Sequence, residues 1–221
     1  MSTQTKRNNK LILMILLTMA VIAVVAIYFG IIRHHRTLSA SEVKIDGMFL
    51  AIAQDISDFQ LTDNQGKPFT KENLKGHWTM IFFGFTNCGY VCPTTLSALN
   101  KMYQTLQSEL PVDQMPQVVM VSVDPERDTV KRMNSYVTAF NPHFIGTRAD
   151  ESATDALEKQ FHIAAAKIQV DGKGKDHYTI DHTAEIILLN PNAKIQAFLS
   201  YPHLPLQMVK DYKLILMATE V

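Results

Sequence analysis

The sequence is short of cysteine, of tryptophan and of net charge. It holds two cysteines and one tryptophan in 221 residues, and 21 basic residues balance 21 acidic ones. Without an excess of positive charge a nucleic acid is not the expected partner, because phosphate backbones select strongly basic surfaces. No internal repeat or low-complexity segment interrupts the chain, which favours a single globular domain. Any thiol chemistry must come from one pair, Cys88 and Cys92.

The one long hydrophobic run covers residues 11–32. These 22 residues carry no charge. The run is long enough to span a bilayer and longer than the core of a signal peptide. We interpret the run as an uncleaved, single-pass transmembrane helix that follows a cytoplasmic tail over residues 1–10. A cleaved signal peptide is the competing interpretation, with a processing site at Leu38-Ser39-Ala40.

Basic residues beside the hydrophobic run give a slight indication of orientation. Lys6, Arg7 and Lys10 precede the run, and Arg33 and Arg36 follow it. The positive-inside rule then favours a cytoplasmic N-terminus. The expected location is the inner (cytoplasmic) membrane, with the soluble domain on the periplasmic or extracytoplasmic side. In that compartment a close pair of thiols oxidises unless a metal or a reductant keeps it reduced.

Residues 33–54 are predicted to form a linker, and residues 55–221 the globular domain. The nearly continuous apolar run 78–85 is typical of a central strand covered on both faces. Strands joined through a helix run parallel, whereas the tight turn 190–194 makes the last two strands antiparallel. The prediction is an α/β fold, a mixed sheet with helices on both faces. Its expected elements are a hairpin over 59–70, strands 78–85, 117–123, 144–147, 184–189 and 195–200, helices 93–109, 125–140 (capped by Asp124), 151–161 and 206–218, and a polar loop over 171–175.

Cys88 and Cys92 lie between the strand-like segment 78–85 and a helix-like one. Two thiols four residues apart either close a disulfide or chelate one soft metal ion, and the spacing alone does not choose. Pro93 suits the first position of a helix, so Cys92 is expected at the helix N-cap, where the helix dipole would lower its pKa. The alternative is a structural disulfide or a buried thiol pair. A disulfide here would close a short loop and stabilise the fold little.

The order of the predicted elements is that of a thioredoxin-like domain, an argument from analogy of fold. In that topology the start of strand 184–189 lies opposite the two cysteines. His182, in Asp181-His182-Thr183, comes just before it. We therefore predict His182 as a third metal ligand, with His177 in the nearby loop as the alternative. Two thiolates and one imidazole suit Cu(I), or Cu(II) with an added ligand, whereas zinc would ask for a fourth ligand or an open water position.

Three blocks of the sequence resemble a known family. They are Cys88-x-x-x-Cys92-Pro93, Val121-Ser122-Val123-Asp124-Pro125-Glu126-Arg127-Asp128-Thr129 and Asp181-His182-Thr183. Together with the predicted anchor they resemble the Sco/SenC family of membrane-anchored copper proteins. The resemblance implies a thioredoxin-like fold, copper bound by Cys88, Cys92 and His182, and a role in maturing the copper centre of a respiratory haem–copper oxidase.

Two functions of different classes follow from the same residues. The first is a copper metallochaperone that passes one copper ion to the copper-centre subunit of the oxidase, with other copper carriers or thiol reductants as further partners. The second is an enzyme, a thiol-disulfide oxidoreductase in which Cys88 and Cys92 reduce the cysteines of the target copper site. We favour the metallochaperone. A peroxiredoxin-like peroxidase is disfavoured, because Phe85 stands where that family has a threonine.

Overall fold

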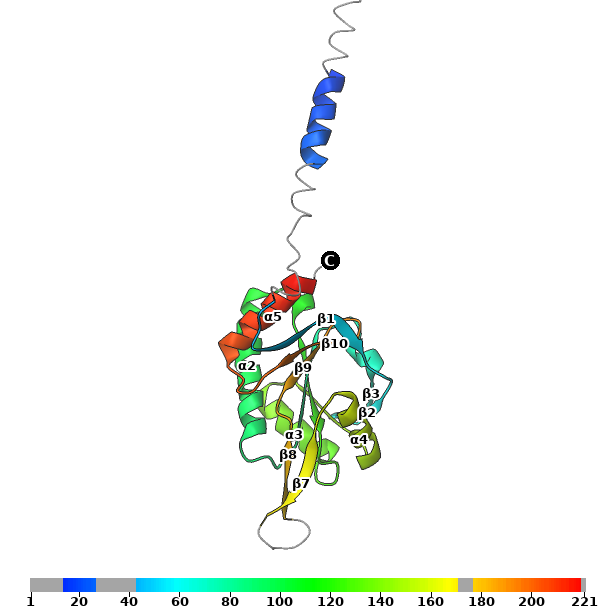
Figure 1. The fold of residues 1–221 in the computed structure, drawn as a ribbon, viewed down its shortest axis with the longest axis vertical. Helices are drawn as coiled ribbons and strands as arrows, with labels where there is room; N and C mark the ends of the chain where they lie inside the picture. Colours follow the sequence, from blue (N-terminus) through cyan, green and yellow to red (C-terminus); the bar gives the residue numbers. More distant parts are fainter. Residues whose placement is uncertain (1–13, 27–42, 171–176, 220–221) are drawn as a thin grey trace, which may run out of the picture. The chain divides into compact units, whose positions relative to one another are not determined.

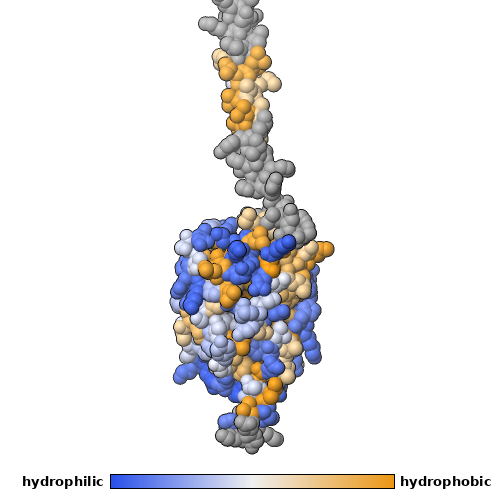
Figure 2. Space-filling model, turned by 60° about the vertical axis from the view of Figure 1, so that its left-hand side comes forward, coloured by the Kyte–Doolittle hydropathy of each residue, from blue (hydrophilic) through white to orange (hydrophobic). Residues whose placement is uncertain are grey.

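The computed structural model describes residues 14–26, 43–170 and 177–219. Its contacts divide the chain into two units, Ser39–Ala218 and the residues outside that range. Residues 14–26 form a helix, blue in Figure 1, and hydrophobic residues cover it in Figure 2. No helix among the described residues combines the length and the apolarity needed to cross a membrane. Outside the described residues lie the predicted tail 1–10, residues 11–13 and 27–32 of the predicted anchor, residues 33–42 of the predicted linker and the polar loop 171–175.

The Ser39–Ala218 unit is built around one mixed sheet. Its strands are β1 (Gly47–Asp55), β2 (Gln60–Asp63), β3 (Pro68–Thr70), β4 (Thr79–Gly84), β5 (Gln117–Ser122), β6 (Ile145–Arg148), β9 (Ile186–Leu189) and β10 (Lys194–Leu199). They are ordered β1-β10-β9-β4-β5-β6-β2-β3. Strand β4 pairs parallel with β5, and β5 with β6, while β9 pairs antiparallel with both β4 and β10. The predicted mixture of parallel and antiparallel pairing is confirmed.

Helices cover both faces of this sheet, as predicted. They are α2 (Val91–Glu109), α3 (Val130–Phe140), α4 (Glu151–Gln160) and α5 (Pro205–Thr219), with short 3-10 turns η1 (Lys71–Leu74) and η2 (Val112–Gln114). Successive residues of a strand point to opposite faces. The ring of Phe83 packs 5.7 Å from that of Phe161 at the end of α4, whereas a side chain on Gly84 would meet Cys92 of α2. Helix α5 lies beside α2 (Figure 1), and an ion pair between Lys213 and Glu109 joins the two helices.

The core sits on the two faces of the central strands. All six residues of β4 are buried, and so are all four of β9 and five of the six in β5. A strand with helices on both faces is expected to be apolar throughout, which explains the continuous run in the sequence. Functional groups can therefore reach solvent only where these strands end, and both β4 and β5 end at the same edge of the sheet.

Two parts of the β-structure were not predicted. Strand β1 falls in the predicted linker 33–54, but its pairing with β10 makes residues 47–54 part of the sheet. A register shift between Phe49 and Gln54 interrupts the alternation of apolar and polar residues, so the sequence shows no clean strand pattern. The second is a separate two-stranded sheet of β7 (Ala165–Gln169) and β8 (Tyr178–His182), which we call the histidine hairpin. Its side chains are mostly exposed, so it lacks a hydrophobic signature.

Helix α3 begins later than predicted. We expected Asp124 as its N-cap and Pro125 as its first residue, but the helix begins at Val130 with Thr129 as the N-cap. The hydroxyl of Thr129 accepts the backbone N–H of Arg132, the bond that defines a capping side chain. Residues 124–128 instead form a turn between β5 and α3, which we call the bridging turn. Its side chains have a different use, described below.

Candidate metal centre

The cysteine loop, residues 85–92, leaves the C-terminal end of β4 and enters α2. Cys88 lies in the loop and is partly exposed, whereas Cys92 is fully buried. The prediction that Cys92 is the N-cap is wrong, because Tyr90 holds that position and Cys92 is the second residue of the helix. Pro93 is compatible with this earlier start, since N–H groups in the first turn of a helix have no intrahelical partner to lose.

The helix N-terminus acts on Cys88 and not on Cys92 itself. The backbone N–H of Cys92 donates to the Sγ atom of Cys88 at 3.3 Å. A hydrogen bond from the Cys92 thiol lowers the pKa of Cys88 to about 4, against a smaller opposing effect of burial. The same hydrogen bond between the two thiols, together with burial, raises the pKa of Cys92. The expected lowering at Cys92 is therefore reversed, and Cys88 is the ionised thiol.

His182 ends strand β8 and faces the dithiol. Its Nε2 atom lies 3.8 Å from the Sγ atom of Cys92. Its Nδ1 atom lies 2.8 Å from the backbone carbonyl oxygen of Thr183, which can only accept a hydrogen bond. Nδ1 must then carry the proton, which leaves the Nε2 lone pair free on the side of the cysteines. The edge-on ring of buried Phe85 packs 6.0 Å from the imidazole.

The structure links the three predicted ligands in a chain of contacts, Cys88 to Cys92 to His182. Among the residues that the structure describes, no three His, Cys, Asp or Glu side chains already form a group able to hold a metal. His177, the alternative ligand, is exposed and lies five residues earlier at the other end of the hairpin, roughly 16 Å away along an extended strand. It is not brought to the dithiol.

The bridging turn is the part of the site that the sequence analysis missed. Asp128 is fully buried, and its carboxylate accepts hydrogen bonds from the Thr86 amide at 3.1 and 3.2 Å and from the Ser122 hydroxyl at 2.7 Å. Burial raises its pKa above the usual range for Asp. One available signal was topological: parallel neighbours β4 and β5 end at the same sheet edge, so residues 122–128 must lie beside the cysteine loop.

Together the fold and the site define a class. The domain is thioredoxin-like, and its strand-to-helix loop carries a dithiol that faces a histidine from a later strand. The SCO1/SenC family model matches residues 52–216, and the chain belongs to this family. The assignment confirms the resemblance drawn from the three sequence blocks.

Relatives in the family share about a third of their aligned residues with this chain. The mitochondrial SCO1 homolog 1 of Arabidopsis thaliana is 32% identical over 172 residues, covering 77% of this chain and 50% of the relative. The human mitochondrial SCO2 homolog is 34% identical over 136 residues, covering 61% and 50%. The chain thus spans about half the length of these two relatives.

Solved structures of the family align with this chain over almost their whole length. The copper-bound ScoI structures of Arabidopsis thaliana and Bradyrhizobium japonicum superpose with TM-scores of 0.66 and 0.63, at 28% and 34% identity. Each match covers 72% of this chain and 97% of the solved chain. The thioredoxin-like Sco fold is thereby established for the domain.

Proposed function

We propose that the protein is a copper metallochaperone that binds one copper ion through Cys88, Cys92 and His182. The copper is cargo, delivered to the copper-centre subunit of a respiratory haem–copper oxidase during assembly. One observation carries the ligand set: the Nε2 lone pair of His182 is directed to the side of Cys92 by the Nδ1 hydrogen bond to Thr183. Membership of the SCO1/SenC family and the two copper-bound relatives support copper as the ion.

The same donors suit transfer as well as binding. Thiolates and imidazole are soft enough for Cu(I), and Cu(II) is accommodated when a further ligand is added. Cys88 is the more exposed of the two thiols, so an incoming ligand from the target reaches it first, while Cys92 and His182 retain the ion. Ligand exchange one donor at a time then moves the copper without releasing it to solvent.

An anaerobic Cu(I) competition titration of the reduced chain tests this proposal. We expect one tightly bound Cu(I) per chain, weakened in His182→Ala and unchanged in the matched variant His177→Ala. The second histidine lies in the same hairpin region but away from the dithiol. Copper affinity that does not depend on His182, or that falls equally in both variants, would reject the ligand set.

A second function is favoured by the asymmetry of the two thiols. Cys88 is accessible and receives the helix N–H, whereas Cys92 is buried directly behind it. That arrangement suits thiol-disulfide exchange: the Cys88 thiolate attacks a target disulfide, and Cys92 then displaces the target as its thiolate, leaving a Cys88–Cys92 disulfide. Two electrons pass to the target. We expect exchange with a disulfide substrate that is lost in Cys88→Ser; a rate no higher than that of a free thiol would remove this function.

We also propose that residues 11–32 anchor the chain in the inner membrane, with the domain on its periplasmic or extracytoplasmic side. The support is the uncharged run itself and the exposed hydrophobic side chains of helix 14–26. Membrane fractionation after alkaline or high-salt washing tests the anchor. Release of the chain into the wash would contradict it.

A further inference from the structure

The two halves of the candidate centre come from separate sheets. The cysteine loop follows β4 of the main sheet, whereas His182 ends the histidine hairpin, whose strands pair only with each other. The 3.8 Å approach of His182 to Cys92 therefore depends on what holds the hairpin against the main sheet. At the His182 end, the amide of Thr183 donates to the carbonyl oxygen of Ala164, a bond within the hairpin region itself. The other end needs a connection to the main sheet.

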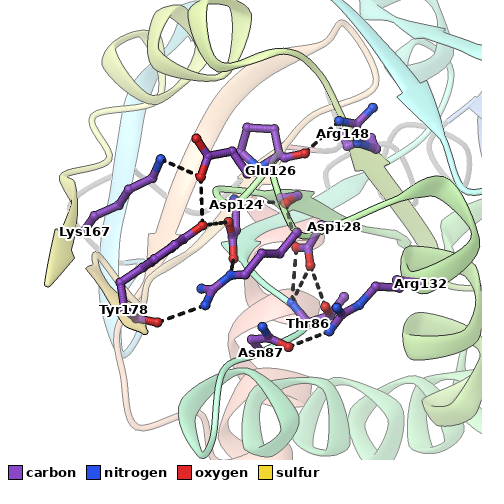
Figure 3. Close-up of polar contacts among 12 residues, drawn as sticks. Thr86, Asn87, Asp124, Glu126, Asp128, Arg132, Arg148, Lys167 and Tyr178 are labelled. Atoms are coloured by element: carbon purple, nitrogen blue, oxygen red, sulfur yellow. Dashed lines mark hydrogen bonds and ion pairs between the residues drawn. The ribbon is translucent and has the colours of Figure 1, made fainter. Parts of the chain in front are cut away.

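The bridging turn makes that connection through its fourth residue, Arg127. Arg127 is largely buried, and its Nη1 atom donates to the carbonyl oxygen of Tyr178, the first residue of β8, at 3.0 Å. Its guanidinium lies 3.7 Å from the centre of the Tyr178 ring, within the range of a cation–π contact. Its Nε atom pairs with Asp124, and Asp124 in turn accepts the Tyr178 hydroxyl at 2.7 Å (Figure 3).

The last residue of the same turn, Asp128, is hydrogen-bonded to the cysteine loop. Asp128 accepts the amide and the hydroxyl of Thr86, two residues before Cys88 (Figure 3). The guanidinium of Arg127 also lies 5.9 Å from the ring of Phe85, and that ring packs against His182. One short turn thus contacts the segments that carry all three predicted ligands.

We infer that Arg127 is a positioning residue for copper binding: it holds the histidine hairpin so that His182 stays within reach of Cys92. The inference rests on the proposed function. Arginine suits the task because one planar group donates to a carboxylate and a carbonyl while its face stacks on a ring, which a lysine ammonium cannot do. The outer contact of the same hairpin, Lys167 with Glu126, is exposed on both sides and contributes little to this hold.

A double-mutant cycle tests whether Arg127 acts through His182. Cu(I) affinity is measured by anaerobic competition on the full reduced chain for Arg127→Met, alone and combined with His182→Ala. Loss of a residue that orients a metal ligand costs about 10- to 100-fold in metal affinity, which we expect for Arg127→Met alone. In the His182→Ala background the same change should cost less than roughly threefold, because there is no imidazole left to position.

Two further measurements separate positioning from a loss of folding. Arg127→Lys keeps the positive charge but not the planar group with several N–H donors, and should show an intermediate loss of copper affinity. In the copper-free chain, amide hydrogen exchange should accelerate in β7 and β8 for Arg127→Met and stay unchanged in β9. The matched variant Lys167→Met should leave both affinity and exchange in β8 near wild type.

The outcomes distinguish the two proposals. If the wild type binds no Cu(I), or binds it without need of His182, the proposed function fails. If the wild type binds in a His182-dependent way and Arg127→Met keeps full affinity, only the positioning role fails. An equal loss of affinity in both backgrounds would also overturn it, because Arg127 would then support the fold and not the histidine.

Discussion

The cysteine loop and the histidine hairpin bring donors to one site with different degrees of support. Every residue of β4, which leads into the cysteine loop, is buried, and so is Cys92, the second residue of α2. Four of the five residues of β7 are exposed, and the hairpin belongs to no larger sheet. The thiols are therefore fixed by the core itself, whereas the imidazole is held by a few polar contacts and by the packing of Phe85 against its ring. For the proposed delivery of copper, a donor with less structural support than the other two would favour release of the ion.

Removing one donor from each region gives the largest expected contrast. Cys92→Ala should weaken Cu(I) binding by more than the roughly 100-fold upper limit seen when an orienting residue is lost, because a thiolate ligand itself is gone. His182→Ala should cost less, since two thiolates still hold Cu(I). Anaerobic competition titrations of both variants give the ratio of their two losses in Cu(I) affinity. Equal losses would mean that the imidazole is held as firmly as the thiols, and the contrast between the regions would fail.

The pH dependence of alkylation tests the electrostatics of the cysteine loop. A pKa of about 4 keeps Cys88 ionised at neutral pH, so its reaction with iodoacetamide should be nearly flat between about pH 6 and 8 and slow down as the pH falls through about 4. An ordinary thiol would instead speed up about tenfold for each pH unit in that range. Mass spectrometry of the reduced chain locates the label, which Cys92 should not take up.

The control for this experiment is Cys92→Ala. It removes the thiol hydrogen bond that is the largest cause of the lowered pKa of Cys88, so the rate should regain a steep rise with pH. A steep rise already in the wild type would show that the cysteine loop does not stabilise the thiolate.

Gly84→Ala, at the end of β4, probes how tightly Cys92 is packed against the main sheet. A Cβ atom there would lie 2.8 Å from the Phe82 ring, closer than real Cβ contacts come, and 3.0 Å from the Sγ atom of Cys92, which is tighter than most. We expect a loss of about 1–3 kcal/mol in the free energy of unfolding, measured by urea denaturation, because overpacking a core forces neighbours to shift. Gly89→Ala, in the cysteine loop that follows β4, is the matched control, since a Cβ atom there would have open space. Equal losses would point to backbone flexibility and not to packing.

These two regions also differ in how far the sequence could predict them. The buried strand β4, helix α2 and the antiparallel pairing of β9 follow from apolar runs and periodicity. In a thioredoxin-like topology these elements are enough to place His182 near the cysteines. The hairpin that carries His182 has no apolar pattern, so the histidine was found from the topology of the later strand and from the family resemblance, and not from periodicity.

What the sequence could not give is the identity of side-chain partners. Asp124 stands before a proline, which reads as a helix cap, yet its carboxylate pairs with Arg127 and accepts the hydroxyl of Tyr178, 54 residues away. A local pattern cannot report a contact of that range. The lowered pKa was likewise assigned to the wrong thiol, because it depends mainly on which sulfur accepts a hydrogen bond from the other thiol, with the helix N–H of Cys92 adding to it, and not on which cysteine precedes the proline.

Tyr178→Phe has the smallest expected effect and shows which contact holds the histidine hairpin. It removes the hydroxyl that donates to Asp124, but keeps both the ring beneath the guanidinium and the carbonyl that accepts from Arg127. The hydroxyl is shared between Asp124 and Glu126, which it reaches at 3.1 Å, and its loss should cost about 1 kcal/mol in the free energy of unfolding. Copper affinity should stay close to wild type, because the guanidinium still spans the turn and the hairpin. Tyr178→Leu removes the ring as well and should resemble Arg127→Met. Tyr178→Phe alone could also weaken copper binding as much as Arg127→Met. In that case the hydrogen bond from the hydroxyl to Asp124, and not the stacked guanidinium, would keep His182 in place.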